Sequence, residues 1–513
     1  MTGAHSLWPA RSTDRLLLLA AVLFPFLALG SAPLFDLDEG AFTASTTEMF
    51  LRGDFLSSYL HGVPRHDKPI LIYWLQAASV SLLGPHEFAW RLPSALASSA
   101  WITLTYLFVS RVADRNSGLT AALMIATAAG LTVITRAATA DALLNLWLAG
   151  AGYAAWLWLR EGRQRWLYLG YLAMALGFLT KGPIAVLIPA GAVLLWCASR
   201  RQWLALRRSL LAPGPILLFF AVAAPWFIIQ TYQEGMGFLS GFFLKHNLSR
   251  FDAPMEGHGG NPFYYVPVLL FSLLPFTGLL LAALSKWRTI WGDDLMRFGL
   301  LWFALVFVLF SFSGTKLPHY LYYGYSGLIP VLAILVGHHL SRFLALAGGI
   351  LLFGLLLALP GLLESATPGL KADDRLLLAH LWTAFSPSYW FWCAGGFAIS
   401  LVLLLPRTGG LRAALHINGT LAGLSIVLFL MPLVGQIQQG PVKAAGLVSR
   451  NLSGPLVLFG NHNSSFQTYA GRLVEKRSPR SGDLVLTRES RLEKLPTAQV
   501  VFRERGYVLV RIP

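Results

Sequence analysis

Long apolar runs recur along the chain from residue 16 to residue 434. Each run is about twenty residues long, which is the length an α-helix needs to cross a hydrocarbon core of about 30 Å. Helices satisfy their own backbone polar groups in lipid, so these runs predict membrane-spanning helices. Thirteen spans are expected, at residues 16–34, 91–110, 118–136, 141–159, 166–180, 184–198, 210–230, 263–284, 298–313, 320–340, 343–362, 389–406 and 413–434.

A polar and amphipathic segment, residues 36–88, follows the first apolar run. Within it, residues 42–52 and 69–83 have the pattern of helices. Apolar side chains recur at helical spacing on one face of the second helix: Ile70, Tyr73, Trp74, Ala77 and Val80. Such a helix lies in the membrane interface or packs on the bundle, and the two arrangements are compatible.

After residue 435 the hydropathy falls and short alternating runs replace the long ones. Strands are predicted at residues 455–459, 483–487, 499–502 and 507–512, the last two forming a hairpin. Residues 465–476 are predicted as a helix. The expected fold is therefore an α-helical polytopic membrane protein, with a transmembrane domain at 1–434 and a small soluble α/β domain at 435–513.

The composition agrees with this fold, because 55% of the residues are hydrophobic and only 12% are charged. A soluble chain carries roughly twice that charged fraction. The net charge of +16 comes largely from basic clusters between apolar runs: Arg111 and Arg115; Arg160, Arg163 and Arg165; Arg200, Arg201, Arg207 and Arg208; Lys286 and Arg288; Arg407 and Arg412. Basic loops of membrane proteins face the cytoplasm. The charge therefore indicates topology rather than nucleic-acid binding.

This topology gives a cytoplasmic N-terminus and, after thirteen spans, an external C-terminus. The first run is expected to be a retained anchor helix, because no small-residue cleavage site leads into a soluble chain. Cys197 and Cys393 lie in or beside apolar spans, far apart in the sequence. Their spacing fits neither a disulfide framework nor a zinc motif.

Charged residues gather in the loops on the external side, including residues 36–88 and 231–262. The candidates are Asp36, Asp38, Glu39, Arg65, His66, Asp67, Lys68, Arg136, Asp141, Lys181, Lys245, His246, Arg250, Lys316, His319 and Tyr320. Charges are scarce in a membrane protein, so a cluster on one side points to function. Cations that hold a phosphate and a carboxylate that takes a proton suit a reaction on a phosphate-bearing lipid.

Several motifs in these loops occur in one order along nearly the whole chain. They are Asp38-Glu39-Gly-Ala-Phe, residues 50–54, residues 67–74 with Lys-Pro-Ile-Leu-Ile-Tyr-Trp, Thr180-Lys-Gly-Pro183, residues 246–251, residues 262–265 and Lys316-Leu-Pro-His-Tyr320. This series resembles the GT-C class of polyprenyl-phosphate-sugar glycosyltransferases. It is most similar to the superfamily of aminoarabinose (lipid A) transferases and protein O-mannosyltransferases.

The resemblance implies roles for individual residues. Asp38 matches an aspartate that acts as general base or orients the acceptor; otherwise it caps a helix. Glu39, with Asp36, is a weaker candidate, and Asp141 is a further catalytic-site carboxylate unless it simply pairs with Arg136. The residues expected to hold the donor phosphate are Lys68, Arg250, Tyr320 and Lys316.

Asp67 and His246 match two positions that can hold zinc in the aminoarabinose transferases. The family commonly has glutamate at the position of Asp67. Two protein ligands are few, since stable zinc sites use three or four. A divalent cation, zinc or magnesium, is therefore an expectation carried by these two residues only. The external histidines are not expected to be catalytic.

The resemblance implies an inverting transfer of a sugar from undecaprenyl phosphate to an acceptor at the periplasmic face of a bacterial inner membrane. The first expectation is a lipid A or lipopolysaccharide acceptor and an aminoarabinose-like sugar, with the protein acting as a monomer in the bilayer. One alternative is a protein or another glycan as acceptor. Another is a flippase without chemistry, which would need polar residues deep in the spans and an internal repeat. The sequence shows neither.

Overall fold

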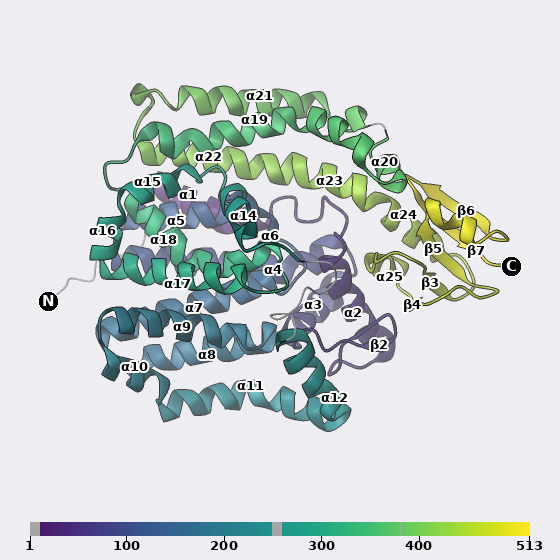
Figure 1. Ribbon diagram of the computed structural model, residues 1–513, viewed down its shortest axis with the longest axis horizontal. Coiled ribbons are helices and arrows are strands. Elements are labelled where there is room, and N and C mark those ends of the chain that lie inside the picture. Colours follow the sequence, from purple (N-terminus) through teal and green to yellow (C-terminus); the bar gives the residue numbers. More distant parts are fainter. Residues whose placement is uncertain (1–10, 249–258, 380) are drawn as a thin grey trace.

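The computed structural model describes residues 11–248, 259–379 and 381–513. In this part, long helices run side by side along one direction (Figure 1). The N-terminal end of the chain lies at one end of the helices, and a small sheet near the C-terminus lies at the opposite end.

Six helical runs in the described residues are long and apolar enough to cross a membrane. They are α4 (Glu87–Val112), α7 (Asp141–Glu161), α11 (Pro213–Glu234), α17 (Asp294–Ser311), the run 342–369 that begins with α19 (Arg342–Ala366), and the run 411–438 that contains α22 (Leu411–Ser425) and α23 (Met431–Gln438). The chain is therefore a multi-pass membrane protein.

Shorter helices complete the bundle and its two ends. Within the bundle lie α1 (Ser12–Leu23), α5 (Arg115–Thr127), α6 (Ala129–Ile134), α8 (Gln164–Lys181), α9 (Ile184–Ser199), α14 (Tyr265–Ser272), α15 (Gly278–Ser285), α18 (Tyr325–Leu335) and α21 (Pro387–Val402). The basic helices α10 (Trp203–Leu210) and α16 (Trp287–Gly292) lie at the N-terminal end in Figure 1. At the other end lie α12 (Met236–Leu239), α20 (Ala372–Leu377) and α24 (Gly440–Ser449).

Several predicted spans are not single helices. The first run, 16–34, is α-helical only to Leu23, because Pro25 lacks the N–H that a continuing helix needs. The run 118–136 is divided at Ala128 between α5 and α6. The run 263–284 is divided between α14 and α15, around Pro275, for the same reason as the first.

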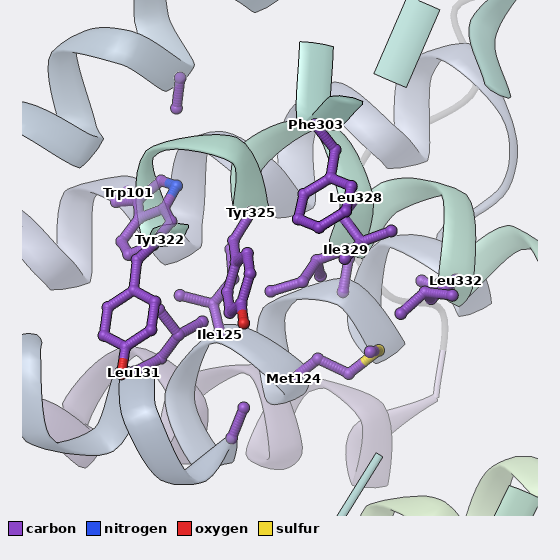
Figure 2. Close-up of a cluster of buried hydrophobic side chains, with 14 of the residues drawn as sticks. Trp101, Met124, Ile125, Leu131, Phe303, Tyr322, Tyr325, Leu328, Ile329 and Leu332 are labelled. Atoms are coloured by element: carbon purple, nitrogen blue, oxygen red, sulfur yellow. The ribbon is translucent and has the colours of Figure 1, made fainter. Parts of the chain in front are cut away.

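The main hydrophobic core contains side chains from α4, α5, α6, α17 and α18, and Figure 2 shows part of it, including Trp101, Ile125 and Phe303. Their polar atoms are satisfied inside it: the indole of Trp101 donates to Ser326 Oγ at 2.9 Å and that of Trp302 donates to Tyr323 O at 3.1 Å. Trp302 lies against Gly152, where a Cβ would come within 2.2 Å of the indole ring. This core fixes α7 against α17 and against the segment that leads into α18.

The first loop, between α1 and α4, contains α2 (Asp38–Arg52), a hairpin of the two-residue strands β1 (Tyr59–Leu60) and β2 (Val63–Pro64), and α3 (Leu71–Leu83). Both helices were predicted. The expected apolar face of α3 is buried at Tyr73, Ala77 and Val80. The helix therefore packs on its neighbours through the face that the spacing predicts.

The C-terminal residues form a five-stranded sheet of order β4-β3-β5-β7-β6. Its strands are β3 (Leu456–Leu458), β4 (Val474–Lys476), β5 (Leu484–Arg488), β6 (Gln499–Glu504) and β7 (Tyr507–Arg511). Strand β3 pairs in parallel with β4 and β5, whereas β7 pairs antiparallel with β5 and β6. The predicted hairpin is thus the β6–β7 pair.

Two predictions for this region were wrong in detail. The predicted helix 465–476 is a single short helix, α25 (Ser465–Ala470), which ends at Gly471 in the left-handed conformation, and the residues that follow form β4. The predicted boundary at residue 434 falls inside the helical run 411–438. The sheet begins only at Leu456, so α24 links the two parts.

Candidate active site

Three side chains at the ends of bundle helices form a closed triangle of polar contacts. Asp141 begins α7, Lys181 ends α8, and Tyr323 lies in the 3₁₀ segment Pro318–Gly324. Lys181 Nζ lies 2.5 Å from Asp141 Oδ1 and 2.6 Å from the Tyr323 hydroxyl, which donates to the same Oδ1 at 2.6 Å. These contacts therefore join α7, α8 and the 3₁₀ segment at the Asp141 carboxylate.

Asp141 does not pair with Arg136, which was the alternative from the sequence. Arg136 donates instead to the carbonyl oxygens of Phe24, Leu27 and Thr132 at 2.7–3.1 Å. These carbonyls lie just past the end of α1 and in α6. Arg136 therefore joins the end of α1 to α6 through hydrogen bonds to the backbone.

His319 connects the triangle to the first loop. Its Nε2 lies 3.7 Å from Asp141 Oδ1. Burial lowers the pKa of His319, against the attraction of Asp141, while Lys181 and Lys68 also lower it and Asp38 raises it. Because Asp38, Lys68, Asp141 and Lys181 all change the pKa of His319, their charges lie near its imidazole ring. Asp38 and Lys68 from the first loop, Asp141 at the start of α7 and Lys181 at the end of α8 thus lie within electrostatic reach of His319, and these five residues are called the cluster.

Asp38 lies in the first turn of α2 and is exposed. A carboxylate in a first helical turn is stabilised by the unpaired N–H groups there. Its two acidic neighbours are both held by hydrogen bonds to other elements. Asp38 is therefore the carboxylate of this loop that is open to a substrate.

Glu39 was predicted to be catalytic, and its surroundings contradict this. Its side chain is only 4% exposed and pairs with Arg91, at 2.7 Å between Oε2 and Nη2. The same carboxylate accepts from Phe35 N at 2.8 Å and Ala138 N at 2.7 Å. Both oxygens are occupied by protein donors, so Glu39 is a structural residue.

Asp36 is also held by the protein. It accepts hydrogen bonds from Ser465 N at 2.9 Å, Ser465 Oγ at 2.5 Å and Asn463 Nδ2 at 3.2 Å. Burial raises the pKa of Asp36 to about 6, although these hydrogen bonds act to lower it. The suggested Asp-x-Asp chelation by Asp36 and Asp38 is not supported, because Asp36 faces the C-terminal sheet.

The loop before α3 supplies an ion-pair network. Lys68 Nζ lies 2.6 Å from Asp67 Oδ1, and Arg65 Nη2 lies 3.3 Å from Asp67 Oδ2. Arg65 also donates to Ala41 O at 2.7 Å, which fixes this loop against α2. The predicted phosphate ligand Lys68 is thus positioned beside the helix that carries Asp38.

These contacts do not fit a metal ion at Asp67. Each oxygen of its carboxylate faces a cation, which a divalent ion would have to displace. The side chain of His246, the other expected ligand, lies outside the described residues. Among the residues that the structure describes, no group of three or more His, Cys, Asp or Glu side chains could hold a metal. The metal stays a prediction without structural support.

The other predicted phosphate ligands differ in their positions. Tyr320 is buried, with its ring centroid 4.8 Å from that of Phe310 and 5.5 Å from Lys181 Nζ, so it lies beside the triangle. Lys316 was predicted to bind phosphate, but its ammonium donates to Ser311 O at 3.1 Å and Ser313 O at 2.5 Å. A lysine commonly satisfies the last carbonyls of a helix in this way. Arg250 lies outside the described residues.

Sequence reasoning missed the catalytic-site positions of His319 and Tyr323. His319 was among the external candidates but was not expected to be catalytic, and Tyr323 was not considered. The run Pro318-His-Tyr-Leu-Tyr-Tyr-Gly324 holds three tyrosines at the start of a predicted span. Polar aromatic residues at the end of a span next to a charged loop could have indicated them.

Known proteins resemble this chain in sequence and in fold. The family of dolichyl-phosphate-mannose-protein mannosyltransferases matches residues 67–229. An uncharacterised protein of Aquifex aeolicus is 30% identical over 339 residues, which are 64% of this chain and 73% of that protein. The undecaprenyl phosphate-alpha-4-amino-4-deoxy-L-arabinose arabinosyl transferase of Pseudomonas aeruginosa (strain UCBPP-PA14) is 31% identical over 355 residues, 67% of this chain. This chain spans 62% of the length of that transferase.

Two solved structures share the fold. ArnT from Cupriavidus metallidurans bound to undecaprenyl phosphate has a TM-score of 0.79 at 18% identity, with 98% of both chains covered. The Archaeoglobus fulgidus oligosaccharyltransferase has a TM-score of 0.50 at 13% identity, over 91% of this chain and 64% of that one. Together with the sequence relatives and the cluster around His319, these likenesses lead to one conclusion: the chain belongs to the GT-C family of polyprenyl-phosphate-sugar glycosyltransferases.

Proposed function

We propose that this protein transfers a sugar from undecaprenyl phosphate to an acceptor at the periplasmic face of a bacterial inner membrane. The acceptor is lipid A or lipopolysaccharide, and the sugar is 4-amino-4-deoxy-L-arabinose or a close analogue. The relatives named as arabinosyl transferases support this choice. The observation that carries it is the exposed Asp38 carboxylate, which shares one cluster with Lys68, Lys181 and His319.

In the proposed topology the chain spans the membrane thirteen times and acts as a monomer. The N-terminus and the basic helices α10 and α16 lie at the cytoplasmic end, as the positive-inside rule requires. The C-terminal sheet lies at the opposite end of the helices (Figure 1), and in this topology it is periplasmic together with the cluster. The prenyl tail of the donor lies among the spans, with its phosphate beside Lys68.

The proposed reaction inverts the anomeric carbon. An acceptor oxygen attacks this carbon from the face opposite the donor phosphate, the bond between the anomeric carbon and the phosphate oxygen breaks, and undecaprenyl phosphate leaves with the electron pair. If the acceptor is a hydroxyl, Asp38 takes its proton. If the acceptor is a phosphate of lipid A, the nucleophile is already ionised, and Asp38 orients it.

The cations act on the leaving group. Negative charge grows on the donor phosphate as the bond breaks, and fixed positive groups nearby stabilise this charge. Lys68 is held by Asp67 and Lys181 by Asp141. Both ammonium groups are therefore already in place before the donor binds, so little reorganisation is needed during the reaction.

The test uses purified protein in vesicles with undecaprenyl-phosphate-linked aminoarabinose and lipid A. Mass spectrometry follows the gain of one sugar on lipid A. Asp38→Asn is expected to lower turnover at least about 100-fold, because the variant neither takes a proton from a hydroxyl acceptor nor orients an ionised one. Glu493→Gln, which makes the same change at an exposed carboxylate of the C-terminal domain, is expected to retain full turnover. Full turnover in Asp38→Asn would reject Asp38 as the reacting carboxylate.

A second candidate acceptor is a protein, which the match of residues 67–229 to the mannosyltransferase family favours. The same vesicles with lipid A replaced by a serine- and threonine-rich peptide distinguish the two acceptors. A sugar gained by the peptide and not by lipid A would support the second candidate. Movement of the intact donor across the vesicle without transfer to either acceptor would support a flippase.

A further inference from the structure

The C-terminal sheet is attached to the first loop at α2, next to Asp38. Helix α25 packs directly on α2, and three contacts reach α2 itself. Thr468 Oγ1 lies 2.9 Å from Thr43 Oγ1, and Gln467 Nε2 donates to Ala44 O and to Glu48 Oε1, both at 3.0 Å. These residues are buried, so the contacts are shielded from water.

The hydrogen bonds of Asp36 lie at the start of α25. Both carboxylate oxygens are used: Oδ1 accepts from Ser465 N, and Oδ2 accepts from Ser465 Oγ and Asn463 Nδ2. The approach is close, because a Cβ on Gly40 would lie 1.8 Å from Asp36 Oδ1 and 2.7 Å from Ser465 N. Only a glycine at position 40 allows the carboxylate, the helix and the sheet loop to meet.

Asp38 is thereby held from two sides. On the membrane side, Glu39 is fixed by Arg91 and by the backbone N–H groups of Phe35 and Ala138. On the side of the sheet, Asp36 is fixed by Ser465 and Asn463. Asp38 lies between these two anchors and is itself exposed. Its position therefore depends on both, although only one belongs to the membrane domain.

We infer that Asp36 is a positioning residue, through which the C-terminal domain sets the place of Asp38 in the active site. The inference rests on the proposed function only for the role of Asp38. Catalytic groups must be held within a fraction of an ångström of their productive place, and buried hydrogen bonds from behind are the usual means. The C-terminal domain is then a structural part of the active site.

A second aspartate–serine contact between the same domain and the helical part of the chain supplies a matched control. Asp373 accepts from Ser490 N at 3.0 Å and from Ser490 Oγ at 2.6 Å, which repeats the contact of Asp36 with Ser465. Asp373 lies in the first turn of α20, in the segment between α19 and α21. Loss of this contact loosens the domain without touching the segment that carries Asp38.

The experiment compares Asp36→Asn with Asp373→Asn in the full-length protein. Asp36→Asn is expected to lower kcat at least tenfold with the KM for the donor unchanged, because the donor phosphate is held by other residues. Asp373→Asn is expected to stay within twofold of the parent protein in both constants. The double variant Asp36→Asn with Asn463→Asp reverses the hydrogen bond between these two side chains, because the amide at position 36 donates to the carboxylate at position 463. It is expected to recover part of the kcat that Asp36→Asn loses.

A second measurement does not depend on the reaction. Leu37 is 49% exposed, and both native cysteines are buried, so Leu37→Cys gives one reactive thiol between the anchors. Its labelling rate by a thiol reagent is expected to rise several-fold when Asp36→Asn is added and to stay constant with Asp373→Asn. Equal labelling rates in the two backgrounds would overturn the inference. A labelling difference in a protein that transfers no sugar would instead reject the proposed function and leave the coupling intact.

Discussion

Glu39 and Arg91 form a buried ion pair that joins the start of α2 to α4, 52 residues further along the chain. Arg91 also donates to the carbonyl oxygens of Leu29, Ala32 and Pro33 at 2.7–3.0 Å. One guanidinium thus satisfies the irregular backbone between the first helix and the active-site loop. The planar fork of arginine is suited to this, whereas lysine has a single nitrogen.

Glu39→Gln is expected to destabilise the protein by about 3–5 kcal/mol, because it leaves the Arg91 charge buried without a counter-ion. Thermal unfolding in detergent measures this as a lower melting temperature. The control is Glu475→Gln, where the carboxylate is 48% exposed and pairs with Arg477. Exposed pairs contribute at most about 1 kcal/mol, so the control is expected to unfold close to the parent protein. Equal losses in the two variants would contradict a structural role for Glu39.

The sequence could show that the acidic loop matters but not which carboxylate is open. Asp36, Asp38 and Glu39 lie within four residues, and motif resemblance favoured Asp38 first. The inward turn of Glu39 depends on Arg91, and that of Asp36 depends on Ser465, 429 residues away. Contacts at such separation leave no local pattern. Hydropathy likewise predicted the six runs of the described residues that are long enough to span a membrane, but it did not reveal where prolines such as Pro25 end the helices.

The sequence also predicted four of the five strands and missed β4. Residues 474–476 follow directly after α25, and the three-residue strand is too short for a periodic pattern. Of the cluster, Lys68, Asp141 and Lys181 were recognised as external charges. Their grouping around His319 was not foreseen, because it depends on the 3₁₀ turn that brings Tyr323 back onto Asp141.

The triangle of Asp141, Lys181 and Tyr323 predicts unequal effects of two small changes. Asp141→Asn leaves the Lys181 ammonium, whose side chain is 10% exposed, without its carboxylate and is expected to cost about 3–5 kcal/mol. Tyr323→Phe removes two hydrogen bonds, one to Asp141 and one from Lys181, and is expected to cost about 2 kcal/mol. Chemical or thermal unfolding of the two variants under the same conditions checks this order. A larger loss in Tyr323→Phe would show that the charge pair is not the main link.

Lys68 is expected to act on donor binding. Lys68→Met is expected to raise the KM for the polyprenyl-phosphate sugar at least tenfold, which corresponds to about 1.4 kcal/mol of lost binding. Lys68→Arg keeps the charge and is expected to lose less. Lys443→Met removes a lysine that pairs with Glu87 at 2.5 Å, away from the cluster, and serves as control. An unchanged KM in Lys68→Met would exclude Lys68 as a phosphate ligand.

A chelator tests the metal that the family resemblance implies. Asp67 is occupied by Arg65 and Lys68, so prolonged treatment with EDTA is expected to leave sugar transfer unchanged. Steady-state turnover before and after dialysis measures the effect. A loss that zinc restores, but that is absent in Asp67→Asn, would show that a cation displaces the two basic side chains.

The contact between the C-terminal domain and the first loop contains two groups with opposite responses to acid. Burial raises the pKa of Asp36 to about 6 from 3.8 and lowers the pKa of His61 to about 4 from 6.5. Asp36 faces Ser465, Asn463 and Glu39, while His61 lies near Val474 O and the charges of Lys476 and Arg65.

The direction of each change in stability with pH depends on whether the folded or the unfolded protein binds the proton at the higher pH. Folded Asp36 binds its proton before the unfolded chain does, so acidification from pH 6 towards 4 stabilises the fold through this group. Folded His61 binds its proton only after the unfolded chain has done so, so acidification from pH 6.5 towards 4 destabilises it. Asp36→Asn is therefore expected to lose more melting temperature than the parent protein between pH 7 and pH 5, and His61→Asn to lose less. Melting curves at these two pH values in one detergent give both differences. If the melting temperatures of both variants differed from that of the parent protein in the same direction, the two groups would not titrate as proposed. Both variants would then report a common loosening of the contact.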